Sequence, residues 1–175
     1  MLTTIIRSHK IAIDPNNKQR TYFARAAGTA RFAYNWALAA WNEQYKAGGK
    51  PSEAALRRKL NAIKGQDFPW MLDVTKCAPQ LAIMNLGQAF KNFFAGRAKA
   101  PRFKKKGHHD SFELSNDQFE LKGRKIRIPK LGWVRLRELL RFQGKIISAT
   151  LSREASRWYV SIAVESKLEP VYSKN

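Results

Sequence analysis

The stretch TTIIRSHKIAIDPNN, residues 3–17, opens the chain and decides how the rest of it must be arranged. Thr3 to Ile13 is rich in β-branched residues and ends at the turn signal DPNN, which predicts an edge or barrel strand. The residues that follow are spaced for helices, and a strand finds no hydrogen-bonding neighbour inside a helical bundle. The first strand must therefore pair with strands that come much later in the chain.

After the turn the hydrophobic period changes to that of a helix. Apolar residues recur at steps of three and four, which places them on one face of a long helix. This stripe consists of Phe23, Ala27, Ala30, Tyr34, Leu38, Trp41 and Tyr45. Asn16 or Asn17 can cap the start of the helix, and Gly48-Gly49 ends it. Two more helices are expected, one capped by Ser52 and one with apolar positions from Ala78 to Phe93, so the block predicts a small helical bundle.

From Ser111 onward the period becomes two, which is typical of strands. The segment FELKGRKIRIP (119–129) predicts a hairpin, and alternating apolar residues between Trp158 and Val164 predict the last strand. Several short strands at this spacing favour a barrel or sandwich. We therefore predict an α+β fold, in which a β-barrel formed by residues 1–13 and 108–168 is interrupted by a helical-bundle insertion. The insertion covers residues 14–107, and residues 169–175 form a C-terminal tail.

The charge of the chain indicates its partner. There are 33 Lys and Arg against 13 Asp and Glu, a formal net charge of +20. Such an imbalance costs self-repulsion, which nucleic acid relieves through phosphate contacts. An anionic membrane is the rival partner, but the sequence has no basic amphipathic helix with an uncovered apolar face and no lipid-anchor motif. Without a signal peptide or an apolar run of roughly 20 residues, we expect a cytoplasmic, nucleoid-associated protein with no membrane partner.

The sequence offers little for catalysis. Its acidic residues are few and lie on different expected elements, whereas metal-dependent nucleases cluster theirs around the ion. Nothing near His108-His109 orients these side chains, and the single cysteine, Cys77, excludes an internal disulfide framework and a cysteine zinc cluster. We expect no catalytic residue, no metal and no cofactor in this chain.

Two basic clusters favour nucleic-acid binding. The interval from Lys91 to Lys106 has no acidic residue, and it contains Pro101, which stiffens it, and Phe103, which can stack on a base or anchor the segment to the core. A second cluster begins at Arg135, so we expect a cleft between two modules that holds a phosphate backbone. The expected phosphate contacts are Arg31, Lys91, Arg97, Arg102, Lys104, Lys105, Lys106, Arg135 and Arg137.

Read in order, five segments resemble the N-terminal half of the TnpB family, the transposon-encoded RNA-guided DNA endonucleases, or OrfB-type transposases. They are GTARFAYNWALAAWNEQYK (28–46), KCAPQLAIMNLGQAFKNFF (76–94), PRFKKKG (101–107), IRIPKLGWVRLR (126–137) and GKIISATLSREASRWYVSIAVE (144–165). The resemblance implies a wedge β-barrel with a helical recognition insert, which together hold a guide RNA and read a short transposon-adjacent DNA motif.

The resemblance also implies which residues read that motif. They correspond to Lys76, Cys77 and Gln80 on the last helix of the insert, and to Ser115 on the returning strand. Lys and Gln suit base-edge contacts, and Ser can serve either strand. Cys77 stands where a bulkier apolar residue is common in the family.

In the family a RuvC nuclease domain follows the barrel, but this chain stops at KLEPVYSKN (167–175), about where that domain would begin. The expected function is therefore a nucleic-acid-binding lobe that binds guide RNA and double-stranded DNA and does not itself cleave. One alternative is a subunit of a split nuclease whose RuvC part is a separate chain. Another is a stand-alone sequence-specific DNA-binding protein, a repressor or transposition accessory, whose helical insert acts like a helix-turn-helix.

Overall fold

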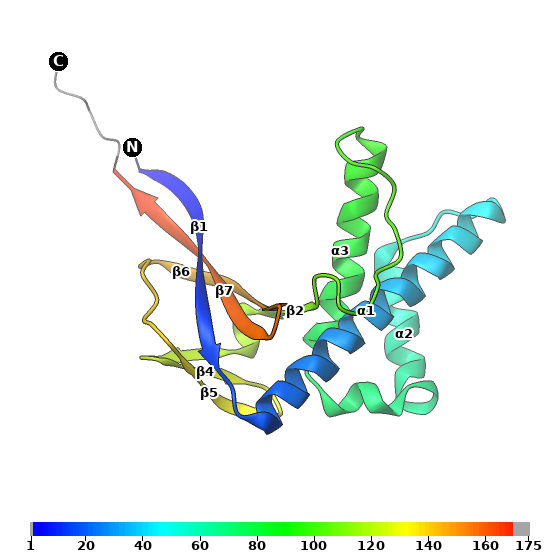
Figure 1. Cartoon of the computed structure of the whole chain (residues 1–175). Helices are drawn as coiled ribbons and strands as arrows, with labels where there is room; N and C mark the ends of the chain where they lie inside the picture. The colour runs from blue at the N-terminus through cyan, green and yellow to red at the C-terminus, as the bar shows by residue number, and fades with distance from the viewer. Residues whose placement is uncertain (1, 170–175) are drawn as a thin grey trace, which may run out of the picture.

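The structure is a computed structural model that describes residues 2–169, and it has three α-helices beside a seven-stranded antiparallel sheet (Figure 1). The α+β class predicted from the sequence is confirmed. The helices are α1 (Asn17–Lys46), α2 (Glu53–Asp67) and α3 (Cys77–Phe94), with the 3-10 turns η1 (Pro69–Asp73) and η2 (Asn116–Gln118). The strands are β1 (Thr3–Asp14), β2 (Ser111–Ser115), β3 (Glu120–Lys122), β4 (Lys125–Ile128), β5 (Gly132–Leu136), β6 (Lys145–Glu154) and β7 (Arg157–Leu168).

Strand β1 lies in the middle of the sheet, whose order is β2-β6-β7-β1-β5-β4-β3. It pairs with β7 from Thr3 opposite Leu168 to Ala12 opposite Tyr159, and its last residues Ile13 and Asp14 pair with β5. The expected pairing of the first strand with strands near the end of the chain is confirmed. The ends of β1 and β7, where Thr3 to Ile5 pair with Ser166 to Leu168, extend past the end of β6 as a two-stranded ribbon (Figure 1).

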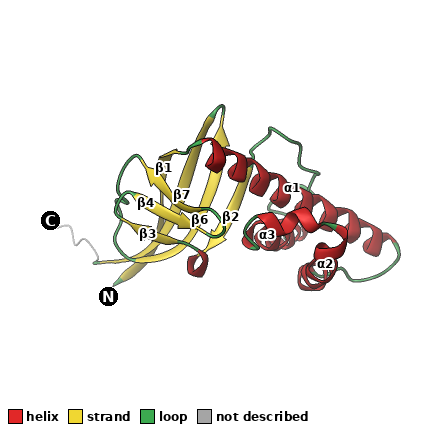
Figure 2. Ribbon diagram, turned by 90° about the horizontal axis from the view of Figure 1, so that it is seen from below, coloured by secondary structure: helices red, strands yellow, loops and turns green. Residues whose placement is uncertain are grey.

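The sheet is open, in place of the closed barrel that we expected. Strands β2 and β3 are its two edges, and no pairing joins them in the described part of the chain. These edges are nevertheless consecutive in the sequence, separated only by η2. Ser115 and Glu120 are five residues apart, so the chain holds their Cα atoms within about 18 Å of each other. The sheet therefore has to curve strongly between its edges, as Figure 2 shows.

The helix ends follow their capping residues. Asn16 caps α1 in a capping box, because its side chain accepts the N–H of Gln19 while the Gln19 side chain accepts the N–H of Asn16, both at 2.9 Å. The hydroxyl of Ser52 accepts the N–H of Ala55 at the start of α2. After α1 the chain passes through Gly48, whose φ of +81° is a conformation that glycine adopts at little cost.

The core joins α1 to the sheet through aromatic rings. Phe23 lies between Phe112 of β2 and Trp158 of β7, with ring centroids 6.1 and 5.2 Å away, and all three side chains are buried. The stripe predicted for α1 is correct through Leu38, and Trp41 packs half-buried against Phe90. It is wrong at Tyr45, which is 61% exposed because the last turns of α1 run beyond the bundle.

Tyr22 holds three elements together. Its hydroxyl donates to the carbonyl of Pro129, in the turn between β4 and β5, at 2.7 Å, and it accepts the N–H of Thr75, just before α3, at 3.0 Å. Burial raises the pKa of Tyr22 to about 12. The start of α3 is thereby fixed against both α1 and the sheet.

Candidate nucleic-acid interface

The four residues expected to read DNA come together where α3 begins. Cys77 and Ser115 are 38 positions apart in the chain, yet the Cys77 Sγ and Ser115 Oγ atoms lie 3.5 Å from each other. Lys76 and Gln80 are exposed on the same first turn of α3. Thr75 starts this turn, since its hydroxyl accepts the N–H of Cys77 at 3.2 Å.

Three of these four side chains reach the surface, and one does not. Cys77 is only 4% exposed, so its thiol lies behind Ser115 and does not reach the surface. The hydroxyl of Ser115 donates to the carboxylate of Asp117 at 2.8 Å, and this hydrogen bond lowers the pKa of Asp117. The surface of the cluster is thus formed by Lys76, Gln80, Ser115 and Asp117.

Lys76 and Gln80 also line a cleft of about 440 Å³ between α2 and α3, here called the α2–α3 cleft. Its polar lining is completed by Arg57, Arg58, Asn61 and Lys64 of α2. Sequence reasoning did not assign Asn61 or Lys64 to a site. Their signal was present, because Arg57, Asn61 and Lys64 follow one another at steps of four and three along one side of α2, at the border of the face that buries Leu56 and Leu60.

Three lysines from different elements lie near one another beside this cleft. Burial lowers the pKa of Lys64, and the charges of Lys130 and Lys76 lower it further. Lys130 sits in the turn between β4 and β5, and its ammonium donates to the carbonyl of Leu72. This mutual repulsion between Lys64, Lys76 and Lys130 is the arrangement that a bound anion relieves.

The basic loop, residues 97–109, runs back from α3 past α1 to β2 without regular structure (Figure 1). Asn35 of α1 fastens it, because its side-chain amide donates to the carbonyl of Lys104 at 2.9 Å and accepts the N–H of Lys104 at 2.8 Å. The Lys104 ammonium lies 4.3 Å from the ring centre of Tyr34, and burial lowers the pKa of Lys104. Phe103 is 56% exposed, so Lys104 and not Phe103 anchors this loop.

Asp110 fastens the end of the basic loop. Its carboxylate, whose side chain is 8% exposed, accepts from Arg31 at 3.2 Å, from the N–H of Gly107 at 3.0 Å and from Arg153. Of the residues expected to bind phosphate, Arg31 is therefore engaged with Asp110, whereas Lys104 is held mainly through its backbone and stays exposed. The remaining expected contacts of this region are exposed: Lys91, Arg97, Arg102, Lys105 and Lys106.

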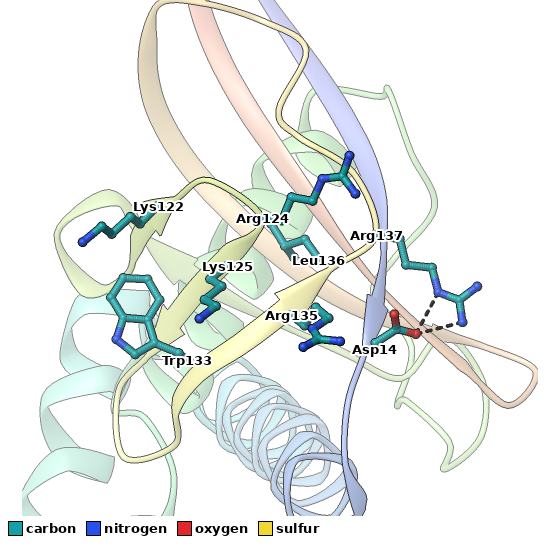
Figure 3. A pocket seen from close by; sticks show the side chains of 8 residues that line it. All are labelled: Asp14, Lys122, Arg124, Lys125, Trp133, Arg135, Leu136 and Arg137. Carbon is teal, nitrogen blue, oxygen red and sulfur yellow. Dashed lines mark hydrogen bonds and ion pairs between the residues drawn. The ribbon is translucent and has the colours of Figure 1, made fainter.

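On the sheet, β3, β4 and β5 form an open concavity of about 750 Å³, here called the sheet-side concavity (Figure 3). It contains the expected residues Arg135 and Arg137, and none of residues 91–106 lines it. Arg137 is paired with Asp14, with nitrogen–oxygen distances of 2.8 Å. The two basic clusters thus face separate surfaces and do not form the walls of this one hollow.

Sequence reasoning missed the other basic residues of this concavity, Lys122, Arg124 and Lys125, and also Trp133. Lys125 lies directly opposite Arg135 across the β4–β5 pair, an arrangement of like charges that costs stability. The sequence did contain a sign of this surface. In β4 the exposed residues Lys125 and Arg127 alternate with the buried residues Ile126 and Ile128, so every second residue faces outward. The repulsion again indicates a surface adapted to an anion.

Two searches of the described residues found nothing. No three His, Cys, Asp or Glu side chains between residues 2 and 169 are grouped closely enough to hold a metal ion. No helix in that part of the chain combines the length and the apolar character required to cross a membrane.

Known proteins resemble this chain over most of its length. The family model HTH_OrfB_IS605, described as a helix-turn-helix domain, matches residues 1–50. The Escherichia coli K12 protein "Putative RNA-guided DNA endonuclease InsQ" is 34% identical over 171 residues, which are 95% of this chain and 42% of InsQ. The chain belongs to the TnpB family.

Other relatives differ in how much of them this TnpB-family chain covers. A Streptomyces pristinaespiralis protein named "Putative RNA-guided DNA endonuclease" is 29% identical over 97% of this chain and 44% of its own length. The Salmonella dublin protein named "Virulence protein VsdF" is 28% identical over 58% of this chain and 95% of its own length. The chain therefore spans less than half the length of the Escherichia coli and Streptomyces relatives, both of which are named as endonucleases.

The description helix-turn-helix does not fit the geometry of the matched residues. Residues 1–50 of this TnpB-family chain contain the strand β1 and one continuous helix of 30 residues, α1. A second helix begins only at Glu53. Within the match there is thus no pair of helices joined by a short turn.

Proposed function

We propose that this chain is the nucleic-acid-binding part of a TnpB-like RNA-guided DNA endonuclease. It holds a guide RNA and reads a short transposon-adjacent motif in double-stranded DNA. Cleavage is the task of a RuvC nuclease outside the residues described here, and the chain acts among the DNA of the nucleoid.

The observation that carries the proposal is the convergence at the start of α3. A resemblance in sequence assigned the same role to Lys76, Cys77, Gln80 and Ser115, which belong to a helix and to a distant strand. The 3.5 Å approach of Cys77 to Ser115 supports a common role for that set. Lys76 and Gln80 expose donors suited to base edges in the major groove. Buried Cys77 supports Ser115 from behind and does not itself touch DNA.

Phosphate binding is divided between two surfaces in this proposal. The sheet-side concavity, with Arg135 at its centre, takes the backbone of the guide RNA. The exposed residues of the first basic region, Lys91, Arg97, Arg102, Lys105 and Lys106, take a second stretch of backbone. Arg31 and Lys104 position the basic loop through Asp110, Asn35 and Tyr34, and Phe103 is free to stack on a base.

The two parts of the fold are assigned accordingly. We propose that the sheet is the wedge, built from residues 1–13 and 108–168, and that residues 14–107 are the recognition insert. The support is that the helices α1 to α3 all lie between β1 and β2 in the sequence.

The test begins with the RNA that copurifies with the chain. We expect one predominant RNA species, bound with an affinity that falls steeply with salt because phosphate contacts release counterions. The RNA complex is then offered a duplex library with a randomised segment, and the enriched sequence gives the motif. Weak binding without salt dependence would overturn the proposal.

Substitutions at the cluster then separate DNA reading from RNA binding. We expect Lys76→Ala and Gln80→Ala each to lower the preference for the selected motif by about tenfold, because a good base contact contributes about 1–3 kcal/mol. Guide RNA affinity should stay within about twofold. Lys46→Ala, which removes an exposed lysine at the far end of α1, is the matched charge control. Equal loss of RNA and DNA affinity in Lys76→Ala would contradict the assignment.

A stand-alone DNA-binding protein is the second candidate. It is favoured by VsdF, a relative that extends little beyond the region it shares with this chain. Tight binding to a defined duplex in the absence of RNA would support this candidate against the first. A neighbouring reading frame that encodes a RuvC domain, if found by sequencing, would instead support a split nuclease.

A further inference from the structure

An aromatic concavity lies along α1, next to the basic loop and apart from the DNA-reading cluster of the proposed function. It has a volume of about 510 Å³ and is lined by Gly28, Arg31, Phe32, Asn35 and Trp36 of α1 and by Trp70 of η1. The α1 residues follow one another at helical spacing, so the hollow is a short groove along one face of the helix. Trp70 closes it from the side of η1.

Trp70 is held in place although much of it is in solvent. Its ring packs edge-on against Phe32, with centroids 5.0 Å apart, and lies 6.2 Å from Phe68. Phe32 and Phe68 in turn pack at 4.8 Å. Despite these contacts Trp70 remains 43% exposed. A large aromatic ring that is fixed on one side and free on the other provides contact area at little entropic cost.

Positive charge lies on the other side of the groove. Asn35, which lines the groove, is the residue that fastens Lys104 of the basic loop. Exposed Arg102, Lys105 and Lys106 neighbour Lys104 in the chain. Two carboxylates lie close to Lys104. Asp110 is 8% exposed and already paired with Arg31 and Arg153, and Glu113 accepts a hydrogen bond from the side chain of Asn85 at 2.8 Å. The groove therefore has aromatic rings on one wall and accessible cations next to the other.

Proteins bind single-stranded nucleic acid by combining aromatic side chains, on which bases stack, with basic residues that contact the phosphate backbone. Bases of duplex DNA are stacked on their neighbours and offer no free face. RNA is recognised mainly through loops and bulges whose unpaired bases stack on aromatic side chains. An apolar peptide would fill the groove equally well, but it would gain nothing from the adjacent cations.

We infer that this groove binds one unpaired base of an RNA strand, stacked on Trp70 and Trp36, with the flanking phosphates on Arg102, Lys105 and Lys106. This inference rests on the proposed function, because it requires that the chain binds RNA. It adds a base-binding site at α1 and η1, separate from the DNA-reading cluster at the start of α3.

The experiment compares two replacements of Trp70. Both fill part of the volume of the tryptophan, but phenylalanine has an aromatic face on which a base can stack and leucine has none. A fluorescently labelled oligouridine strand is titrated with the full chain at low and at high salt. We expect Trp70→Leu to weaken binding by about tenfold and Trp70→Phe by about twofold or less, since stacking on one aromatic ring accounts for the loss. Tyr45→Ala, which removes another exposed aromatic ring of α1, should leave the affinity unchanged. Thermal unfolding of each variant checks that the fold is intact.

Each other outcome has a definite meaning. If both Trp70 variants weaken RNA binding equally, or if neither does, the stacking site is overturned. The proposed function stands in that case as long as the chain binds RNA in a salt-dependent way. If an oligothymidine DNA strand binds as tightly as oligouridine, and if this binding also depends on Trp70, the groove does not select RNA. The assignment of the groove to an RNA base is then overturned. Absence of salt-dependent RNA binding by the unaltered chain overturns the proposed function and this inference with it.

Discussion

The basic loop and the sheet-side concavity carry the same charge but are supported in different ways. The loop has no backbone ladder, and it is fastened by side chains, namely Asn35 at Lys104 and Asp110 at Arg31 and Arg153. The residues of the concavity stand on β3, β4 and β5, whose backbone hydrogen bonds do not depend on which side chains they carry. A basic surface on a loop is therefore more vulnerable to a single substitution than one on a sheet.

The largest expected effect tests this difference with two aspartates. Asp110→Ala leaves two partly buried guanidinium groups without their shared carboxylate, and we expect it to lower the free energy of unfolding by about 2–3 kcal/mol. Asp14→Ala removes the exposed pair with Arg137 at the edge of the concavity and should cost less than about 1 kcal/mol. Urea denaturation of both variants measures the two changes in the free energy of unfolding. Equal losses of stability would show that the loop and the concavity do not differ in how they are supported.

A smaller effect is expected from Asn35→Ala. It deletes both hydrogen bonds to the backbone of Lys104, at a cost of about 1–2 kcal/mol, and it should release the basic loop. Hydrogen exchange of residues 102–106 should become faster, and RNA affinity should fall several-fold. Gln88→Ala is the control, since that side chain bonds only Asn92 on the surface of α3. Unchanged exchange in the loop would show that other contacts hold it.

The smallest effect on stability is expected from Arg135→Ala on the sheet. It removes both the repulsion from Lys125 and the attraction of Asp14, which lie opposite Arg135 on the two neighbouring strands, so the free energy of unfolding should stay nearly the same. RNA affinity should nevertheless fall, and the slope of log affinity against log salt should decrease by about one. A clear loss of stability would mean that the concavity, like the loop, depends on its side chains.

Several features could be predicted from the sequence because their causes are local or periodic. Asn16 and Ser52 start helices through hydrogen bonds to residues three positions away. The two-residue and helical periods identified the strands and most of the buried face of α1. The isolated first strand required distant partners, and it has β7 and β5.

The set of residues proposed to read DNA could be assembled only by resemblance, and the structure places its members at different depths. Cys77 follows Lys76 directly, but one faces the core and the other the solvent because α3 buries one side against its neighbours. The missed residues, Lys64, Lys125 and Trp133 among them, lie on outward faces that the periodicity marks as solvent-exposed. Periodicity shows which face of an element is exposed, but it does not distinguish an exposed face that binds a ligand from one that is only solvated.

What the sequence alone determined is the type of each element, its ends, the excess of positive charge and the family. The tertiary structure decided which charges remain available. The Arg31 guanidinium is paired with Asp110 and the Lys104 ammonium lies over the ring of Tyr34, whereas Arg135 lies between Asp14 and Lys125 on the two neighbouring strands. The same residue types differ in this way because the charge that a side chain presents to a ligand depends on partners brought near by folding, many of them distant in sequence.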